Sequence, residues 1–210
     1  MKAYIVTYPF INNLNILRQK NEEDYIIAVD DAVFFLIGEK IKFDYAIGDF
    51  DSNNSLSYVK SLKNVIILPE EKDQTDTEAA IELAAKLKVK ETVLLGGIGG
   101  ERIEHTLANI TLIKKYPNLR ILNDQSEIFS LSEGNHTVKF DGYVNIFAEE
   151  NSTISLEGFK YPLKDYHLKP EQVIGISNEI TANFGQIAVK KGRILVILTI
   201  LDNKKRQNTP

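Results

Sequence analysis

The chain has 210 residues, of which 43% are hydrophobic and 26% are charged, and its formal net charge at pH 7 is −4. This composition is typical of a globular protein, and the acidic balance argues against non-specific binding to nucleic acid, which requires a basic surface. The sequence has no cysteine, which excludes disulfides and thiolate metal sites, and no apolar run approaches the roughly 18 residues of a membrane-spanning helix.

The first part of the chain alternates short apolar strands with helix-like segments. We expect strands at 4–7, 25–29, 45–47, 65–68, 92–95 and 119–122. We expect helices at 11–19, 32–38, 56–62 and 105–115, and one more that carries the apolar stripe of Ala80, Leu83, Ala84 and Leu87. This alternation predicts an α/β fold, with a mostly parallel sheet covered by helices on both faces.

Beyond about residue 125 the pattern changes to short strands separated by turn residues, without a periodic segment of helical length. We expect strands at 127–132, 137–140, 143–148, 153–156, 180–182, 187–189 and 194–201. This pattern predicts an antiparallel β-sandwich or barrel. The sequence therefore predicts two domains, at 1–125 and 126–210.

Polar or glycine-rich segments directly follow four strands of the first domain: Asp30, Asp49, the loop 69–78 and the glycine cluster at 96–100. The carboxyl ends of parallel strands share one edge of a sheet, and ligands of such sheets bind at that edge. We therefore expect the four segments to form one site.

Asp49 and Asp51 form the most distinctive pair at this edge, because they follow the apolar run 45–47 and its glycine directly. In an extended backbone they would point to one side, with Phe50 directed into the core. Two adjacent carboxylates repel each other unless a cation lies between them, and a hard divalent ion prefers oxygen ligands. The alternative is a solvated turn in which the side chains bond to their own backbone.

The loop that precedes the helix near residue 80 combines acidic and basic groups. Thr75 and Glu78 fit a capping box, and Asp76 complements the helix dipole, which is a sufficient structural explanation for these residues. The functional interpretation is that Asp76 shares a cation with Asp49 and Asp51, while Lys72 meets a phosphate.

The glycine cluster lies between a strand and a helix and precedes Arg102 and His105. Glycines there let backbone N–H groups approach an anion near a helix N-terminus, and a guanidinium binds phosphate oxygens in a forked geometry. A tight turn between strand and helix would also require glycines, and His105 would then be an ordinary residue at the start of a helix. The spacing fits neither a dinucleotide-binding fingerprint nor a Walker loop.

Taken together, five ordered motifs resemble those of the thiamine pyrophosphokinase family. The motifs are Gly48-Asp49-Phe50-Asp51-Ser52, Lys72-Asp73-x-Thr75-Asp76-x-Glu78, Gly97-x-x-Gly100-x-Arg102-x-Glu104-His105-Thr106-Leu107-Ala108-Asn109, Gly158-Phe159-Lys160-Tyr161-Pro162-Leu163 and Gly175-Ile176-Ser177-Asn178-Glu179. The resemblance implies a catalytic α/β domain that binds ATP and magnesium, a thiamine-binding β-sandwich, and a homodimer with its active site at or near the subunit interface. The implied reaction converts thiamine and ATP to thiamine diphosphate and AMP.

The resemblance and the residue analysis agree on the expected roles. Asp49, Asp51 and Asp76 are expected to hold Mg²⁺, and together with Arg102 they form the expected catalytic set. The residues expected to bind ATP or thiamine are Asp30, Lys72, Asp73, Thr75, Gly97, Gly100, Arg102, His105, Ser177 and Asn178. The sequence identifies no general base.

Ser177 and Asn178 offer a hydroxyl and an amide to the thiamine ring, although a plain turn would also explain them. Tyr161, Tyr166 and Phe184 are the alternatives for an aromatic that stacks on the ring. The chain departs from the family pattern at Asp31, where glycine is usual, at Glu104, where aspartate is usual, and at Glu101.

Three alternatives to thiamine pyrophosphokinase activity are kept: a pyrophosphokinase for another hydroxymethyl heterocycle such as a pterin, a metal-dependent phosphohydrolase, and a non-catalytic binding module. The N-terminus lacks the pattern of a signal peptide, so we expect a cytoplasmic protein whose ligands are small molecules.

Overall fold

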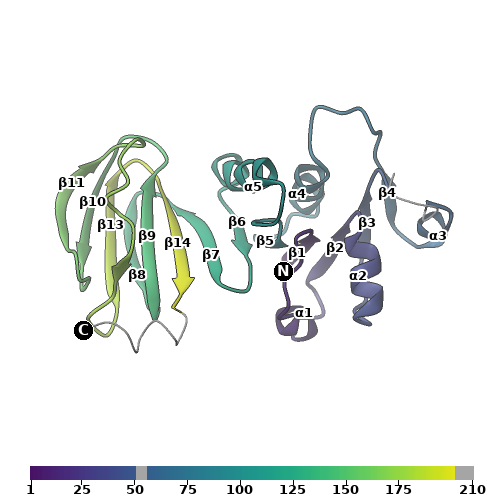
Figure 1. Cartoon of the computed structure of the whole chain (residues 1–210), viewed down its shortest axis with the longest axis horizontal. Coiled ribbons are helices and arrows are strands. Elements are labelled where there is room, and N and C mark those ends of the chain that lie inside the picture. The colour runs from purple at the N-terminus through teal and green to yellow at the C-terminus, as the bar shows by residue number, and fades with distance from the viewer. Residues whose placement is uncertain (51–55, 202–210) are drawn as a thin grey trace. The chain divides into compact units, whose positions relative to one another are not determined.

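The computed structural model describes residues 1–50 and 56–201. By its internal contacts the chain divides into two compact units, Met1–Asp124 and Gln125–Pro210. The first unit alternates strands and helices, and the second consists of strands in its described residues (Figure 1). These two architectures confirm the predicted fold class, an α/β region followed by an antiparallel β region.

The first unit is built on a parallel sheet of six strands in the order β6-β5-β1-β2-β3-β4. The strands are β1 (Lys2–Thr7), β2 (Tyr25–Val29), β3 (Tyr45–Gly48), β4 (Val65–Ile67), β5 (Glu91–Gly96) and β6 (Leu119–Leu122). The central strands are almost entirely buried, as their continuous apolar runs predict for a sheet covered on both faces.

Within residues 1–50 and 56–201, five helices connect these strands: α1 (Asn15–Arg18), α2 (Ala32–Gly38), α3 (Leu56–Ser61), α4 (Asp76–Lys86) and α5 (Ile103–Lys115). Helix α4 contacts β1, β2 and β3, whereas α5 contacts β6 and α4. The predicted helix at 11–19 is wrong in extent, because α1 has a single turn. The preceding segment is held as a loop by the Asp124 carboxylate, which accepts hydrogen bonds from the backbone N–H groups of Asn12 at 2.9 Å and Asn13 at 3.1 Å.

The second unit contains two antiparallel sheets, with strand orders β12-β9-β14-β7 and β11-β10-β13-β8. The strands are β7 (Ser126–Leu131), β8 (Gly134–Val138), β9 (Gly142–Ala148), β10 (Ser152–Glu157), β11 (Leu163–Leu168), β12 (Asn178–Glu179), β13 (Gly185–Lys191) and β14 (Ile194–Ile200). One buried cluster takes side chains such as Ile146 and Val196 from the first sheet and Ile154 and Ile187 from the second. This shared core confirms a sandwich.

Two strands of the sandwich differ from the sequence expectation. The prediction omitted β11, because three of its six side chains are exposed and polar (Lys164, Asp165 and His167), which hides the apolar alternation. The predicted strand at 180–182 is replaced by the two-residue β12, after which Ile180 forms only an isolated bridge with Phe159. Both strands lie at sheet edges, where burial constrains sequence least.

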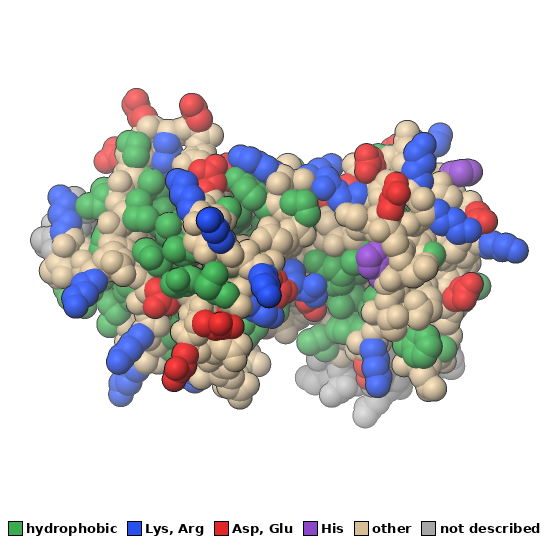
Figure 2. Space-filling view, turned by 180° about the vertical axis from the view of Figure 1, so that it is seen from behind, with side chains coloured by type: hydrophobic (Ala, Val, Ile, Leu, Met, Phe, Trp, Pro, Cys, Tyr) green, Lys and Arg blue, Asp and Glu red, His purple; other side chains and the backbone are tan. Residues whose placement is uncertain are grey.

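Charged side chains of both signs are interspersed over the face of the molecule in Figure 2, so the net charge of −4 is not gathered in one patch there. Among the described residues, no helix is long and apolar enough to cross a membrane.

The glycine cluster after β5 forms an arch that depends on glycine at specific positions. Gly96 has a φ of +85°, and a Cβ there would lie 2.1 Å from the Pro9 carbonyl oxygen and 2.5 Å from the Thr7 carbonyl oxygen. Gly99 has a similar φ of +83°, but its Cβ would meet nothing within 4 Å. The backbone of β1 and the following loop therefore pass directly against Gly96, whereas Gly99 is required by backbone conformation alone.

This pair allows a matched test of the arch. Gly99→Ala should lower the free energy of unfolding by about 1–2 kcal/mol, the cost of a left-handed backbone in an L-residue. Gly96→Ala has the same cost and also a backbone clash, so we expect a loss of about 2–5 kcal/mol. Urea denaturation of both variants measures the difference, and equal losses would show that the close approach at Gly96 is not tight.

Candidate active site

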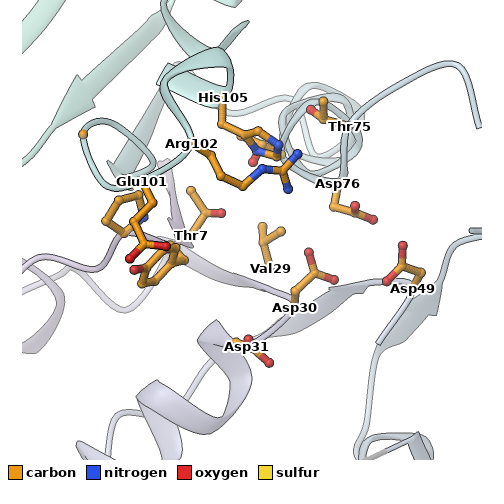
Figure 3. A pocket seen from close by; sticks show the side chains of 14 residues that line it. Thr7, Val29, Asp30, Asp31, Asp49, Thr75, Asp76, Glu101, Arg102 and His105 are labelled. Atoms are coloured by element: carbon orange, nitrogen blue, oxygen red, sulfur yellow. The ribbon is translucent and has the colours of Figure 1, made fainter. Parts of the chain in front are cut away.

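A pocket of about 350 Å³ lies at the carboxyl edge of the parallel sheet (Figure 3). Its lining comes from the ends of β1, β2 and β3 and from the first turns of α4 and α5, which agrees with the binding edge of this fold class. The lining residues are Thr7, Tyr8, Pro9, Val29, Asp30, Asp31, Asp49, Thr75, Asp76, Thr77, Gly99, Glu101, Arg102 and His105.

Three carboxylates from three elements gather on one side of this pocket. Asp30 follows β2, Asp49 follows β3, and Asp76 begins α4. Figure 3 shows their side chains close together, whereas Asp31 lies apart at the start of α2. The predicted convergence of the strand ends is thus present for Asp30, Asp49 and Asp76.

Asp51, the third predicted metal ligand, lies outside the described residues. The extended backbone expected through this segment is wrong at Phe50, whose φ of +52° is left-handed. The Phe50 side chain is nevertheless buried in the core of the first unit, as predicted. The extended backbone of β3 therefore does not continue through Phe50, although the side chain of this residue is anchored in the core.

Lys72 connects two of the three carboxylates. Its Nζ lies 3.2 Å from Asp49 Oδ2 and 3.2 Å from Asp76 Oδ1, and it donates a hydrogen bond of 3.0 Å to the Pro69 carbonyl oxygen. Only 12% of its side chain is exposed. Partial burial opposes the charge on Lys72, but the bonds to Asp76 and Asp49 outweigh burial and raise its pKa above the ordinary value.

Asp30 is the third carboxylate and is held in an unusual conformation. Its φ of +49° is left-handed, and its side chain lies directly against Gly48, where an added Cβ would be 1.8 Å from Asp30 Oδ1. That oxygen is buried and has no hydrogen-bond partner among the described residues. Burial, then the charges of Asp76 and Asp49, raise the pKa of Asp30 to about 7.

These acidic groups fit a hard divalent cation in chemistry. A buried carboxylate oxygen without a partner, next to two other carboxylates, is an oxygen-rich site of negative charge. Within residues 1–50 and 56–201, however, no group of three or more potential ligands is already arranged around a metal position. Two of these carboxylates, Asp49 and Asp76, are instead paired with the Lys72 ammonium.

The glycine arch and the start of α5 form the other side of the pocket. Two α5 side chains hold the arch: Asn109 Nδ2 donates to the Gly97 carbonyl oxygen at 2.6 Å, and Thr106 Oγ1 accepts from Gly99 N–H at 2.9 Å. Arg102 and His105 line the pocket opposite the carboxylates (Figure 3). Residues 97 and 100 are thus part of the arch rather than of the pocket lining.

The three residues that depart from the family pattern are Asp31, Glu101 and Glu104. Arg102 Nε donates a hydrogen bond of 2.8 Å to Glu104 Oε1, and both side chains are largely exposed. The interaction with Arg102 helps to lower the pKa of Glu104, after a hydrogen bond from its own backbone. The longer Glu104 side chain therefore reaches the guanidinium on the surface, while Glu101 and Asp31 line the pocket itself.

Only some of the predicted residues in and next to the loop before α4 line the pocket. Thr75 is the N-cap of α4, its Oγ1 accepting from Glu78 N–H at 3.1 Å, and it also lines the pocket. The Glu78 carboxylate forms an ion pair of 2.7 Å with Lys115 of α5. Asp73 is exposed and is not among the lining residues. The structural and functional interpretations of Thr75 are therefore compatible.

Sequence reasoning missed the contribution of β1. Thr7, Tyr8 and Pro9 line the pocket directly after this strand, and Tyr8 is 64% exposed. The Tyr8 ring contacts Phe10 edge-on, and Phe10 stacks on Phe35 with ring centroids 4.2 Å apart. The rule that drew attention to the ends of the other strands applies equally to β1, so position after the strand was the available signal.

Ser177 and Asn178 lie in the second unit and have different environments. The Asn178 side chain is buried, accepts from the backbone N–H groups of Tyr161 and Glu179, and donates to the Tyr161 carbonyl oxygen at 2.9 Å. Ser177 is exposed, with its backbone N–H bonded to Asn145 Oδ1 at 2.8 Å. Asn178 thus fixes the backbone of the exposed Tyr161.

The other two aromatic candidates for stacking on the thiamine ring also differ in their exposure. Tyr166 is partly buried and packs against the sandwich core, whereas Phe184 is 47% exposed. Tyr161 and Phe184 are therefore the two candidates with rings accessible to a ligand.

The raised pKa of Asp30 predicts a pH dependence of stability. Between its ordinary pKa of 3.8 and its folded value of about 7, the folded chain binds the proton more tightly than the unfolded chain. The free energy of unfolding therefore decreases as the pH rises through this window. In EDTA-treated protein we expect Asp30→Asn to have a melting temperature several degrees above wild type at pH 8 and close to wild type at pH 5.

Asp31→Asn provides the control for this measurement, since it removes an exposed carboxyl from the neighbouring position and should show only a small part of the effect, because the charge of Asp31 is the last of the causes that raise the pKa of Asp30. Differential scanning calorimetry at both pH values tests the prediction. A melting temperature of Asp30→Asn below wild type at pH 8 would contradict it.

Comparisons with known proteins identify the family. Residues 17–123 match the model for the thiamin pyrophosphokinase catalytic domain, and residues 132–194 match the model for the thiamin pyrophosphokinase vitamin B1 binding domain. The chain is 30% identical over 189 residues to thiamine pyrophosphokinase of Bacillus subtilis, covering 84% of this chain and 88% of that protein. It is also 26% identical over 204 residues to thiamin pyrophosphokinase 1 of Caenorhabditis elegans, covering 87% and 82% of the two chains.

Solved structures agree with this assignment. The crystal structure of thiamine pyrophosphokinase from Bacillus subtilis matches with a TM-score of 0.81 and 27% identity, covering 95% of this chain and 99% of that one. The enzyme from Geobacillus thermodenitrificans matches with a TM-score of 0.82 and 26% identity, covering 97% and 99%. Both domain models and the full-length relatives agree, and the chain therefore belongs to the thiamine pyrophosphokinase family.

Proposed function

We propose that this chain transfers the pyrophosphoryl group of ATP to the hydroxyl of thiamine, which yields thiamine diphosphate and AMP. The observation that carries the proposal is the pocket at the carboxyl edge, where Asp30, Asp49 and Asp76 lie opposite Arg102. Matches to both family domain models support the same substrates, because one model describes a catalytic domain and the other a vitamin B1 binding domain.

In the proposed reaction the oxygen of the thiamine hydroxyl forms a bond to the β-phosphorus of ATP, and the hydroxyl proton is released to water. The bond between that phosphorus and the oxygen bridging to the α-phosphorus breaks, and AMP leaves with the electron pair. Transfer of this kind requires the protein mainly to position the reactants and to stabilise developing negative charge. In the proposal, Arg102, which lines the pocket, and Lys72, which is paired with two of its carboxylates, supply that positive charge, and His105 orients a phosphate oxygen.

Mg²⁺ is the proposed metal, and Asp49 and Asp76 are its proposed ligands together with Asp51. When bound, the ion neutralises phosphate oxygens and withdraws charge from phosphorus. Asp30 lies beside this set with one oxygen unpartnered among the described residues. Its role in the proposal is to add negative charge next to the metal ligands and to contact a ligand that enters the pocket.

Each substrate contains a planar ring, and each unit has exposed aromatic side chains on which such a ring could stack. Tyr8 lines the pocket and offers an exposed ring to the base of ATP. For the thiamine ring we propose Ser177 as a hydrogen-bonding group and Tyr161 or Phe184 as the stacking aromatic, with Asn178 positioning Tyr161. The homodimer, the site at its interface and the cytoplasmic location stay predictions of the sequence.

Product analysis tests the reaction directly. Incubation with ATP, Mg²⁺ and thiamine should give AMP and thiamine diphosphate in equal amounts, and EDTA should abolish both. AMP formed at the same rate without thiamine would indicate a phosphohydrolase instead. Product formation only with a hydroxymethyl pterin would indicate a related pyrophosphokinase.

Asp49→Asn tests the proposed metal ligand. Loss of one charged oxygen ligand at the phosphates should lower kcat by about 10²–10³-fold, a typical cost of removing one group that stabilises the transition state. Steady-state kinetics with saturating Mg²⁺ measures this, and circular dichroism checks that the fold is retained.

The control variant for this measurement is Asp165→Asn. Asp165 is an exposed carboxylate that is paired with Lys190 in the second unit, much as Asp49 is paired with Lys72. The control should keep its fold, because exposed ion pairs contribute little to stability. Its kcat should stay within about 2-fold of wild type. Near-normal turnover of Asp49→Asn would refute its proposed role.

A further inference from the structure

Lys72 occupies a position that matters for metal binding. It lies in the loop between β4 and α4, and its ammonium lies 3.2 Å from carboxylate oxygens of both Asp49 and Asp76. These two carboxylates belong to different elements, the end of β3 and the start of α4. In the structure the positive charge between them therefore comes from the chain itself.

The electrostatic reason for this arrangement is the surplus of acid. Three carboxylates, Asp30, Asp49 and Asp76, gather on one side of the pocket, and Lys72 forms ion pairs with two of them. An ammonium between two carboxylates relieves their mutual repulsion and lets them stay close in a partly buried site. The arrangement is stable without a metal, but it uses one oxygen of each prospective ligand.

A divalent ion and the Lys72 ammonium compete for the same place. Mg²⁺ binds oxygen at about 2.0–2.1 Å, so an ion shared by Asp49 and Asp76 would lie close to the present position of Nζ. Two cations at such a separation repel each other strongly in a site shielded from water. Binding of the ion to both carboxylates therefore requires Lys72 to leave them.

The nucleotide provides Lys72 with another anion. A lysine ammonium is a compact charge on a flexible four-carbon stem, so it can move by several ångströms without a change in the backbone. Phosphate oxygens in the pocket would attract it, and the ammonium would then no longer compete with the ion for the two carboxylates. Because coupling between two ligands is reciprocal, the metal would likewise strengthen binding of the phosphates.

We infer that Lys72 is a positioning residue that exchanges its partners during ligand binding, from Asp49 and Asp76 to the phosphate chain of ATP. It weakens metal binding in the free protein and makes binding of metal and nucleotide mutually dependent. The inference rests on the proposed function for the identity of the nucleotide. It differs from a fixed structural ion pair, in which Lys72 would stay in place and the metal would bind beside it.

Lys72→Met separates these two possibilities by the sign of its effects. Methionine keeps most of the length of the side chain and removes the charge. We expect the affinity of the nucleotide-free protein for Mn²⁺, measured by electron paramagnetic resonance, to rise about tenfold or more. We expect kcat/KM for Mg·ATP to fall in the same variant, because the phosphates lose a cation.

Thermal melting gives a second readout that does not depend on turnover. In EDTA the Lys72→Met protein should melt below wild type, because two carboxylates then repel each other. Added Mg²⁺ should raise its melting temperature more than it raises that of wild type, since a ligand that binds the folded state more tightly stabilises it more. Lys72→Gln should change in the same direction and serves if the methionine variant does not fold.

Lys115→Met is the matched control. It also removes a lysine that is paired with an acidic residue of α4, at 2.7 Å from Glu78, but Glu78 does not line the pocket, whereas both carboxylates paired with Lys72 do. Exposed ion pairs contribute little to stability, so the variant should fold normally. Its Mn²⁺ affinity and its kcat/KM should stay within about 2-fold of wild type. A matching rise in Mn²⁺ affinity in this control would show a non-specific effect of charge and overturn the inference.

Unchanged or weaker Mn²⁺ binding in Lys72→Met and Lys72→Gln would also overturn it, since Lys72 would then not compete with the ion. The measurements of Mn²⁺ affinity and melting temperature need no turnover. If wild type made no thiamine diphosphate but the variants still bound Mn²⁺ more tightly, the proposed reaction would fail while the exchange at Lys72 would be supported.

Discussion

Negative charge concentrated at the carboxyl ends of β2 and β3 is the constraint on which the pocket depends. Asp30, Asp49 and Asp76 lie on one side of it, and one oxygen of Asp30 is buried without a partner among the described residues. Such a group of carboxylates is unfavourable unless cations accompany it, and in the structure Lys72 accompanies two of the three. The stability and the chemistry of the pocket are therefore governed by the same charges.

The scaffold holds these charges in place through contacts that have no direct chemistry. Gly48 lies against Asp30, and Phe50 is anchored in the core immediately after Asp49. On the opposite side, Thr106 and Asn109 hold the glycine arch that precedes Arg102 and His105, which line the pocket from the start of α5. Residues that appear in the family motifs thus divide into those that face the ligand and those that fix the backbone around it.

Membership of the family explains why the two units have such different designs. The matched catalytic domain covers the parallel sheet except β1, and the strand ends of this sheet present charged groups at one edge, as binding of phosphates requires. The matched vitamin B1 binding domain covers most of the sandwich, where the Asn178 side chain forms two hydrogen bonds with the Tyr161 backbone and so positions this residue. An uncharged ring such as an aminopyrimidine is suited to exposed aromatic and hydroxyl groups of this kind.

The amino-acid sequence alone determined the class of fold and most of the site. Continuous apolar runs require strands buried on both faces, and parallel strands must end at one edge, so Asp30, Asp49 and the glycine cluster had to converge. Only tertiary structure decided the contacts between residues far apart in the chain. Periodicity carries no information on which ammonium lies between Asp49 and Asp76, on the loop that Asp124 holds at Asn12, or on the left-handed turn at Phe50. These features depend on packing and charge in three dimensions, which local pattern does not encode.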